Sequence, residues 1–448
     1  MKFIADLHIH SKYARAVSPK MTLSELDRWA DDKGIQVMGT GDFTHPLWYP
    51  QLVEQLEPAE PGLYRLKEKF KLLTIKGTKA DTRFLLTTEV SCIYTRAGKG
   101  RRVHALIFAP DLASVKKIND ALTVRGANLK SDGRPIMGLD IVEVLKIVLE
   151  GNPEAALVPA HIWTPWFALF GSKSGFNTLE ECFGEYSKHI FAMETGLSSD
   201  PLMNWRWSAL DNIAFISNSD SHSLERIGRE ANIFNTELSY SGIMSALKKN
   251  DAKSLVGTIE YFPEEGMYHF DGHRKCGVSY DPQATRKQRG ICGQCGKPVT
   301  VGVLNRLDKL ADRTESEVAR ATKQVAIGEV QGKQFGKRPP FINLVTLDSI
   351  IGEAFDVGAK SKRVKAEYDA MIKAFGNELD ILMSIPLSSL QATTYHLEPS
   401  ILEGIRRMRA GQLHITPGYD GEYGEVHIFD TKEKRTIKRG GAKTLFDL

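Results

Sequence analysis

The chain opens with KFIADLHIH (Lys2–His10), an apolar run that ends in the pattern Asp6-x-His8-x-His10. Because side chains alternate between the two faces of a strand, these three groups share one face and lie close together. Imidazoles and carboxylates gathered in this way are common metal ligands. Solvated or internally hydrogen-bonded histidines are the alternative interpretation. We favour a metal site, because chance rarely places this pattern at the end of an apolar run.

The same rhythm recurs along residues 1–262. Amphipathic stretches separate further apolar runs. One such stretch, Thr22–Lys33, is predicted to be a helix that Thr22 or Ser24 caps at its N-terminus and Gly34 ends. The further apolar runs are Ile35–Gly39 with Asp42 beyond it, Arg83–Glu89, Arg102–Ala109 with His104, Ala155–His161, Ile190–Thr195 with Glu194, and Asn212–His222 with Asp220 and His222. Strands that alternate with helices predict an α/β fold with a largely parallel sheet or barrel.

The carboxyl ends of such strands meet at one edge, where α/β proteins place their chemistry. Many carboxylates and imidazoles at one edge would repel each other or lose their hydration at a high free-energy cost. Divalent cations between them remove that cost. The sequence therefore predicts a site for divalent metal ions at this edge.

These motifs resemble those of the PHP (polymerase and histidinol phosphatase) superfamily, which implies a distorted (β/α)7 barrel with two or three divalent ions (Zn²⁺, Mn²⁺ or Mg²⁺). Ions held in this way imply phosphodiester hydrolysis by a metal-bound hydroxide. The resemblance implies two ligand sets that share one carboxylate: His8, His10, Glu89 and Asp220 for a first ion, and Glu89, His104 and His161 for a second. We predict catalytic roles for Asp220 and Asp6. Asp6 and Glu194 either bind a metal ion or orient a ligand.

A third ion would bind Asp42 and His222, with or without His45. The superfamily usually has a histidine directly after this aspartate, whereas Phe43 follows it here. A further histidine expected shortly after the first motif is absent at positions 13–16. Sites with two ions and with three ions both stay open.

A second constellation lies in residues 263–300, which are rich in Gly, Cys, Arg and Lys. His273-x-x-Cys276 and Cys292-x-x-Cys295 are separated by residues 277–291, a spacing that suits one tetrahedral structural Zn²⁺. A redox-active cysteine pair is the weaker alternative, and His269 is the alternative fourth ligand. The segment has no apolar core of its own, so we expect it to fold only with the metal.

Residues predicted to contact DNA fall in three places. They are Phe43, His45 and Trp48 after the strand end at Asp42, then Trp163, Trp166, Phe167 and Lys173 after His161, and Arg274 and Lys275 in the zinc segment. Aromatic rings beside a phosphodiester-cleaving centre can stack on unpaired bases or wedge a duplex open. Basic side chains on a zinc module bind the phosphate backbone. The alternatives are aromatic residues that cap the barrel and a zinc module that only links domains.

The length of the chain, 448 residues, and the changes in composition along it predict three domains. These are a metal-dependent barrel (1–262), a zinc-binding module (263–300) and a mainly helical, DNA-binding domain (301–448). Within the last, Glu315–Lys337 is the predicted mobile linker, and 414–424 is the predicted hairpin or ordered loop. The tail Thr444–Leu448 is a candidate for docking on a sliding clamp, although the glutamine expected in such tails is absent.

The composition excludes several classes of protein. Hydrophobic residues make up 42% and charged residues 25%, as in soluble globular proteins, and no apolar run is long enough to span a membrane. An odd number of cysteines, 5, and an N-terminus without a signal-peptide pattern argue against secretion, so we expect a cytoplasmic protein. A net charge of +4 is compatible with nucleic-acid binding but does not establish it.

Several longer strings resemble the endonuclease Q family of DNA-repair nucleases: 39–48, 159–175, 194–201, 217–220 and 272–276. The resemblance implies a nick on the 5′ side of a deaminated base (uracil, hypoxanthine or xanthine) or of an abasic site in damaged DNA. It also implies 3′-hydroxyl and 5′-phosphate ends. The alternatives from other classes are a small-molecule phosphatase of the histidinol-phosphate kind and a non-catalytic nucleic-acid-binding protein.

Overall fold

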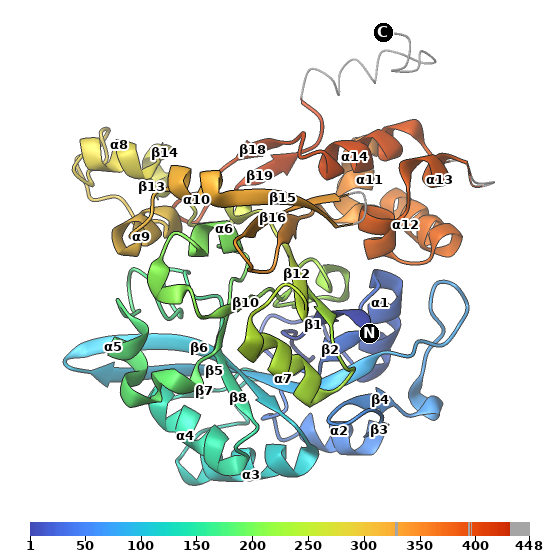
Figure 1. Cartoon of the computed structure of the whole chain (residues 1–448), viewed down its shortest axis with the longest axis horizontal. Helices are drawn as coiled ribbons and strands as arrows, with labels where there is room; N and C mark the ends of the chain where they lie inside the picture. Colours follow the sequence, from blue (N-terminus) through green and yellow to red (C-terminus); the bar gives the residue numbers. More distant parts are fainter. Residues whose placement is uncertain (328–329, 393–394, 396, 431–448) are drawn as a thin grey trace.

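The strand that opens the chain, β1 (Lys2–Asp6), lies inside a large mixed sheet in the computed structural model (Figure 1). It pairs in parallel with β2 (Val37–Gly39), which pairs in parallel with β5 (Arg83–Arg96). On its other side, β1 pairs antiparallel with β11 (Ala231–Asn235), and β11 with β12 (Leu255–Glu260). The structure describes residues 1–327, 330–392, 395 and 397–430.

The remaining strands extend this sheet or form small sheets of their own. They are β3 (Leu56–Pro58), β4 (Tyr64–Leu66), β6 (Lys99–Ala109), β7 (Ile136–Met137), β8 (Ala156–Pro159), β9 (Ala192–Glu194), β10 (Ala214–Ile216), β13 (Asp271–His273), β14 (Val278–Tyr280), β15 (Thr322–Ile327), β16 (Val330–Phe335), β17 (Phe341–Asn343), β18 (His414–Thr416) and β19 (Glu425–His427). The helices are α1 (Leu23–Lys33), α2 (Tyr49–Gln55), α3 (Leu112–Val124), α4 (Ile141–Gly151), α5 (Leu179–Phe183), α6 (Pro201–Asn204), α7 (Tyr240–Lys249), α8 (Pro282–Lys287), α9 (Val303–Leu310), α10 (Glu315–Ala321), α11 (Leu347–Phe355), α12 (Lys362–Phe375), α13 (Leu387–Gln391) and α14 (Pro399–Arg409).

The prediction of a largely parallel sheet is wrong where β5 meets β6. These two strands form an antiparallel hairpin around Ala97-Gly98, whose φ angles are 51° and 72°. Two consecutive residues with positive φ make the tight turn that fits the twist of paired strands. Both strands run past the apolar runs seen in the sequence, so Glu89 and His104 lie within strands and not at their ends.

Strand pairing does not close a ring among the described residues. β6 pairs with β8, and β9 pairs in parallel with β10 as a separate two-stranded sheet, but no ladder joins these two sheets. Mixed α/β architecture is therefore confirmed, and the closed (β/α)7 barrel stays a prediction.

Helix α1 begins and ends as the sequence predicts. The Thr22 side chain accepts a hydrogen bond from the Glu25 amide, which satisfies one free N–H group of the first turn. Gly34 ends the helix in the left-handed conformation, with φ of 92°. The apolar face of α1 then packs into the core through Leu23, Leu26 and Ala30.

The predicted linker at Glu315–Lys337 is wrong. Thr314 and Glu317 form a reciprocal capping box that starts α10, and β15 and β16 follow as an antiparallel hairpin. β16 pairs with β17, which pairs in parallel with β12, so this segment extends the main sheet. Its polar composition is typical of an edge hairpin as well as of a linker, which explains the error.

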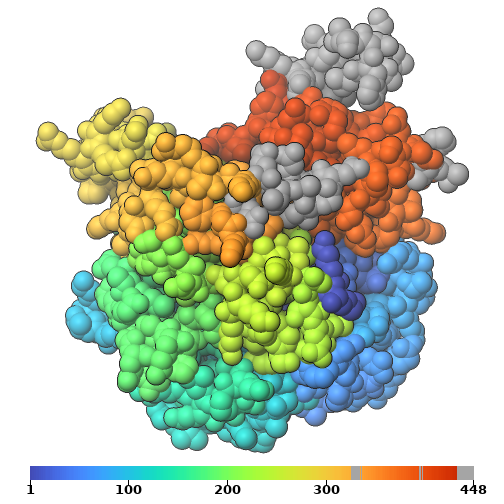
Figure 2. Space-filling model, viewed as in Figure 1, coloured from blue at the N-terminus to red at the C-terminus, as the bar shows by residue number. Residues whose placement is uncertain are grey.

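The C-terminal helices α11–α14 lie across one side of the α/β part (Figure 1). A buried ion pair between Lys33 of α1 and Glu378, to which the Tyr368 hydroxyl also donates, ties these helices to the first helix. The segment that contains β13, β14 and α8 projects from the body at the other end of this layer (Figure 2). β18 and β19 form the hairpin predicted around 414–424.

Two further predictions concern the chain as a whole. No helix in the described ranges combines the length and the apolar character that crossing a bilayer requires. The clamp-docking tail, Thr444–Leu448, lies outside the described residues.

Candidate metal centre

Three loops, which follow β2, β8 and β10, bring side chains together beside β1. Asp42, His161 and Asp220 stand in these loops, and all three have positive φ, of 47°, 30° and 45°. Such conformations are unfavourable for residues other than glycine and persist where the surrounding structure enforces them, often at functional sites. The fold therefore holds these three side chains in imposed positions.

The first predicted ligand set is assembled in the structure. One donor atom from each of His8, His10, Glu89 and Asp220 lies within 4.8 Å of the others. His10 Nε2 is 3.1 Å from Asp220 Oδ1 and 3.2 Å from Glu89 Oε2. His8 Nε2 is 3.5 Å from both carboxylates, is buried, and has no hydrogen-bond partner within the described part of the chain. An unpaired buried nitrogen that faces two carboxylates fits a cation between them.

The second predicted set shares Glu89 with the first. Its other oxygen, Oε1, is 2.7 Å from His104 Nδ1 and 3.0 Å from His161 Nε2. The two imidazole nitrogens are 3.3 Å apart, so at least one of them presents a lone pair toward the other ring. Glu89 thus faces both sets, one with each oxygen, which is the arrangement of a bridging carboxylate.

Two further carboxylates fix the ligand histidines from behind. Glu194 Oε1 is 2.9 Å from His8 Nδ1, and Asp42 Oδ1 is 3.0 Å from His10 Nδ1. Carboxylate–histidine pairs of this kind set the ring tautomer and orientation in metal sites. Of the two roles left open for Glu194, its position supports the orienting one.

The third ion predicted at Asp42 and His222 stays a prediction. Asp42 already accepts hydrogen bonds at both oxygens, from His10 and from the Ser11 amide at 2.6 Å. The His222 ring packs 4.7 Å from that of His10, and its Nδ1 lies 2.9 Å from the Asp220 carbonyl. His45 is stacked on Tyr13, at 4.6 Å between ring centroids.

Asp6 supports the loop that carries Asp220. Its two oxygens accept hydrogen bonds from the amides of Ser219 (3.1 Å) and Gly228 (3.0 Å). Burial raises its pKa to about 6, against the effect of these hydrogen bonds. Of the two roles left open for Asp6, its position supports the one in which it holds the loop of Asp220 in place.

The charges around the two N-terminal histidines are those expected of a cation site. Burial alone would lower the pKa of His8 and of His10, but the surrounding carboxylates, Glu194 and Asp42 foremost, raise both well above the usual value. The histidines in turn lower the pKa of Asp220, against the effect of burial. Protons on His8 and His10 thus balance the negative charge of the carboxylates, a role that bound metal ions would take over. Because protons and metal ions compete for the same groups, we expect metal affinity to fall as the pH is lowered.

Arg134 completes the centre, and the sequence analysis missed it. Its Nη1 is 3.1 Å from Glu89 Oε2. The neighbouring Gly133 permits this approach, because a Cβ there would lie 2.4 Å from Asp42 Oδ2. Arg134 belongs to a turn and not to a strand end, so the pattern that located the other residues does not find it.

A pocket of about 590 Å³ opens beside both ligand sets. The candidate ligands His104, His161 and Asp220 line it, together with Arg102 and Arg134. Its aromatic lining comes from distant segments: Trp166, Phe167, Tyr268 and Tyr423. The rings of Trp166 and Tyr268 meet edge to face at 5.5 Å. The arrangement offers metal ligands, cationic groups and stacking surfaces within one hollow.

Two solved structures resemble this chain over its full length. The crystal structure of the lesion-specific endonuclease PfuEndoQ from Pyrococcus furiosus has a TM-score of 0.78 and 28% identity, and the match covers 98% of this chain and 99% of that one. A structure of endonuclease Q in complex with a 27-mer duplex substrate, with an abasic lesion at the active site, has a TM-score of 0.79 and 28% identity over 100% of both chains. The chain is a structural relative of endonuclease Q. The resemblance predicted from the sequence strings is confirmed.

Curated sequences give a consistent result. YqxK of Bacillus subtilis is 29% identical over 437 residues, which cover 95% of this chain and 99% of YqxK. MJ0043 of Methanocaldococcus jannaschii is 29% identical over 272 residues, which cover 59% of this chain but span only 31% of the length of MJ0043. A family model described as the MJ0043 C-terminal domain matches residues 346–412, the region of α11–α14.

The predicted zinc ligands also come together in this structure. Donor atoms of His273, Cys276, Cys292 and Cys295 all lie within 4.8 Å of one another, and His269 is not among them. Burial raises the pKa of the Cys292 thiol, but hydrogen bonds from the amides of Gln294 and Cys295 outweigh this effect and lower the pKa to about 6. The lower pKa favours the thiolate that zinc requires. The small apolar cluster of this segment contains Val278, Cys292 and Val299. The donor chemistry fits zinc, and so little apolar contact agrees with a fold that depends on metal.

The residues predicted to contact DNA fall into three groups, which are buried, half-buried and exposed. His45 belongs to the buried group and is stacked on Tyr13. Phe43, Trp48 and Trp163 are fully buried in the core, where Trp163 Nε1 donates to Asn204 and Trp48 Nε1 to the Gly41 carbonyl. Side chains in such positions cap the interior and are out of reach of DNA in this structure. Trp166 and Phe167 are half-buried in the pocket wall, whereas Lys173, Arg274 and Lys275 are exposed.

We expect Glu194→Gln to weaken metal binding or catalysis about 10- to 100-fold, the usual effect of losing a carboxylate that orients a ligand histidine. Glu194 also accepts hydrogen bonds from the His161 amide and from Asn218, so the amide would present a donor where acceptors are needed. Metal content after dialysis measures the effect. Glu180→Gln, on the exposed face of α5, is the matched control. Equal metal retention and equal activity in both variants would refute the orienting role.

Proposed function

We propose that the chain is a metal-dependent endonuclease that cuts damaged DNA on the 5′ side of the lesion and leaves 3′-hydroxyl and 5′-phosphate ends. Its targets are abasic sites and deaminated bases: uracil, hypoxanthine and xanthine. The observation that carries the proposal is a pocket lined by residues from both ligand sets. End-to-end similarity to an endonuclease Q structure with an abasic duplex supports DNA as the occupant.

His8, His10, Glu89 and Asp220 would hold one divalent ion and Glu89, His104 and His161 another, on the PHP pattern. Such ions, Zn²⁺, Mn²⁺ or Mg²⁺, supply Lewis acidity and a water nucleophile at neutral pH. The chain's own contribution is rigid placement. Glu194 and Asp42 fix the two N-terminal histidines, and Asp6 anchors the loop of Asp220. Positioning of this kind lowers the entropic barrier to in-line attack.

The aromatic lining accounts for selection of a damaged nucleotide. Extrusion of a base from a duplex costs least at a mispair or an abasic site, so a protein that reads extruded nucleotides favours lesions. Trp166 and Tyr268 offer stacking surfaces within the pocket, and Tyr423 lines it from the β18–β19 hairpin. We propose these three as contacts for the displaced nucleotide or its neighbours.

The outlying segments would hold the duplex. Arg274 and Lys275 are exposed beside the zinc ligands, and Lys173 is exposed after the aromatic loop. We propose that they bind phosphates, with residues 263–300 as a zinc-stabilised clamp and residues 301–448 as a further DNA-binding domain. A C-terminal contact with a sliding clamp remains part of this proposal.

A comparison of substrates tests the function. The protein, loaded with Mn²⁺ or Mg²⁺, would be given duplexes with one uracil, hypoxanthine or abasic site, an undamaged duplex and a simple phosphomonoester. The proposal is supported if the damaged duplexes are cleaved and neither the undamaged duplex nor the phosphomonoester is. Turnover of the phosphomonoester without DNA cleavage would instead identify a small-molecule phosphatase, and tight DNA binding with no turnover a non-catalytic binding protein.

We expect Arg134→Ala to slow cleavage by roughly 100-fold or more, the usual cost of removing a group that stabilises charge in the transition state. Arg134 lies against Glu89 and lines the pocket, where its guanidinium can bind a phosphate oxygen in two-point contact. Single-turnover cleavage rates at saturating enzyme separate this effect from weaker DNA binding. Arg125→Ala, on the exposed end of α3, is the control. A normal rate in Arg134→Ala would exclude the residue from catalysis.

A further inference from the structure

Asp220, a member of the first ligand set, is held in a backbone conformation that aspartate does not favour. Its φ angle is 45°, and a residue other than glycine takes such an angle where neighbouring groups impose it. The Ser219 carbonyl belongs to the peptide group that precedes Asp220, so a change in φ at Asp220 must turn either this carbonyl or the side chain. A contact that holds the carbonyl therefore limits where the carboxylate can lie.

Arg229 makes that contact. Its Nε and Nη2 both donate hydrogen bonds to the Ser219 carbonyl, at 2.9 and 2.8 Å. Two donors from one planar guanidinium fix the direction of the carbonyl more closely than a single donor would. On the other side of Asp220, the Ser221 carbonyl accepts a hydrogen bond of 3.0 Å from the His10 amide. The candidate ligand thus lies between two peptide groups that are both held in place.

Arg229 is itself held by its surroundings. Asp6 accepts a hydrogen bond from the amide of Gly228, the residue before it, at 3.0 Å. The guanidinium lies over the ring of Tyr261, with Cζ 5.7 Å from the ring centroid. The Tyr261 amide donates to Glu230, the residue after Arg229, at 3.1 Å. The ring is therefore a fixed platform for the guanidinium.

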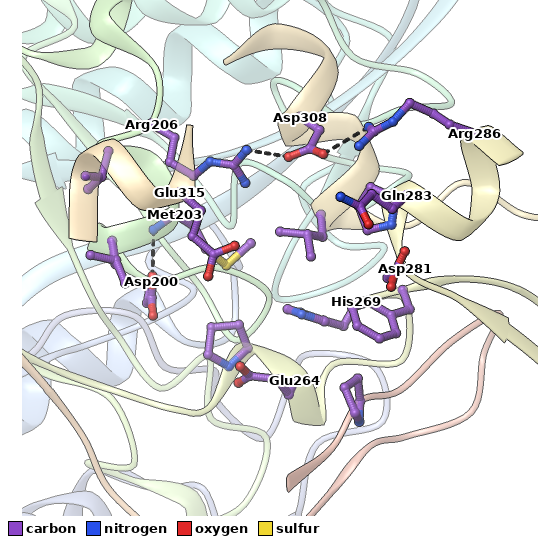
Figure 3. Close-up of a pocket in the computed structure, with 17 residues that line it drawn as sticks. Asp200, Met203, Arg206, Glu264, His269, Asp281, Gln283, Arg286, Asp308 and Glu315 are labelled. Atoms are coloured by element: carbon purple, nitrogen blue, oxygen red, sulfur yellow. Dashed lines mark hydrogen bonds and ion pairs between the residues drawn. The ribbon is translucent and has the colours of Figure 1, made fainter. Parts of the chain in front are cut away.

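The charge of Arg229 is not used in an ion pair. Arg206 and Arg286, which line a separate cavity, show the usual arrangement, because both bind the carboxylate of Asp308 (Figure 3). Arg229 is half-buried, yet its polar contacts in the part of the chain that the structure describes are the two hydrogen bonds to Ser219. These two bonds therefore account for its placement.

We infer that Arg229 is a positioning residue that holds Asp220 in the geometry of a metal ligand. The inference rests on the proposed metal-dependent function, and Arg229 acts through the Ser219 carbonyl. Without the guanidinium, the peptide group between Ser219 and Asp220 is free to turn toward a negative φ at Asp220. That rotation moves the carboxylate away from His8 and His10, which now lie 3.5 and 3.1 Å from its Oδ1.

A titration with Mn²⁺ tests the inference on the full-length protein, after dialysis to remove exchangeable metal. Two ligand sets predict two binding steps, and the step that Asp220→Asn weakens is the one that involves Asp220. We expect Arg229→Met to weaken this same step roughly 10-fold and to leave the other step unchanged. Arg229→Lys keeps the charge and one donor, so its loss should be smaller. Arg125→Met, exposed at the end of α3, is the control.

Two substitutions of the platform separate positioning from folding. Tyr261→Phe keeps the ring under the guanidinium, so we expect normal Mn²⁺ affinity. Tyr261→Leu removes the ring and should weaken the step that involves Asp220 by roughly 2- to 5-fold. Melting temperatures without Mn²⁺ establish that each variant is folded.

Three results would overturn the inference. Equal affinities of Arg229→Met and Arg125→Met at both steps would do so and would leave the metal centre and the proposed function in place. Equal weakening of both steps in Arg229→Met would show a general loss of structure and no specific action on Asp220. An absence of saturable Mn²⁺ binding to the unsubstituted protein would overturn the metal centre itself, and this inference with it.

Discussion

Asp220→Asn is expected to reduce strand cleavage at a lesion by roughly a thousandfold or more, because loss of a metal ligand removes several kcal/mol of transition-state stabilisation. Asp220 Oδ1 lies between His8 and His10, and the residue lines the pocket. Asparagine keeps the shape of the side chain but not its charge. It also tolerates the left-handed backbone at this position, where φ is 45°, so the loop should keep its conformation.

The fold and the affinity for DNA should be close to normal in this variant, because the exposed basic residues are untouched. Asp356→Asn is a closely matched control, since Asp356 is exposed, ends α11 and also has positive φ, of 50°. Metal content, DNA binding and nicking rate would be measured on both proteins. Nicking by Asp220→Asn at the rate of the control would refute the assignment of the metal centre.

Cys292→Ser is expected to release the structural zinc and unfold residues 263–300. Structural zinc contributes on the order of 10 kcal/mol to small zinc domains, far more than this segment's apolar cluster of Val278, Cys292 and Val299 can replace. Cys292 is buried in the segment, so serine would add an unpaired hydroxyl where a thiolate is needed. Affinity for duplex DNA should fall with it, because Arg274 and Lys275 are carried by the same segment.

Elemental analysis gives the zinc count, and limited proteolysis reports the order of the segment. Cys182→Ser serves as the control, because Cys182 is buried at α5 and is not one of the four clustered ligands. An unchanged zinc count in Cys292→Ser would remove the basis for a metal-stabilised clamp.

Local motifs predict most of the side chains that the structure brings together as candidate metal ligands. His8 and His10 follow from alternation along one strand, and Asp220 from a polar burst after an apolar run. Such patterns involve residues close together in the sequence, so they can be recognised without knowledge of the fold. The pairing of ligands into two sets came from resemblance to the PHP superfamily, and the geometry of Glu89 agrees with it.

What the sequence did not reveal depends on contacts between distant segments. Arg134 reaches Glu89 only because Gly133 lets a turn approach Asp42, and Tyr423 enters the pocket from a hairpin near the end of the chain. The prediction that all the aromatic residues of these loops contact DNA fails for a related reason. Trp163 and Trp166 are three residues apart, yet one is buried and the other lines the pocket, a difference that the packing sets and composition does not.

The most direct test of the central claim is the position of a nick in an end-labelled duplex with a single abasic site. The protein would be loaded with Mn²⁺ or Mg²⁺, and an otherwise identical undamaged duplex would be run beside it. The account predicts one product, with a 3′-hydroxyl end immediately 5′ of the lesion, that is absent from the undamaged duplex. No cleavage of the damaged duplex, or equal cleavage of both duplexes, would contradict it.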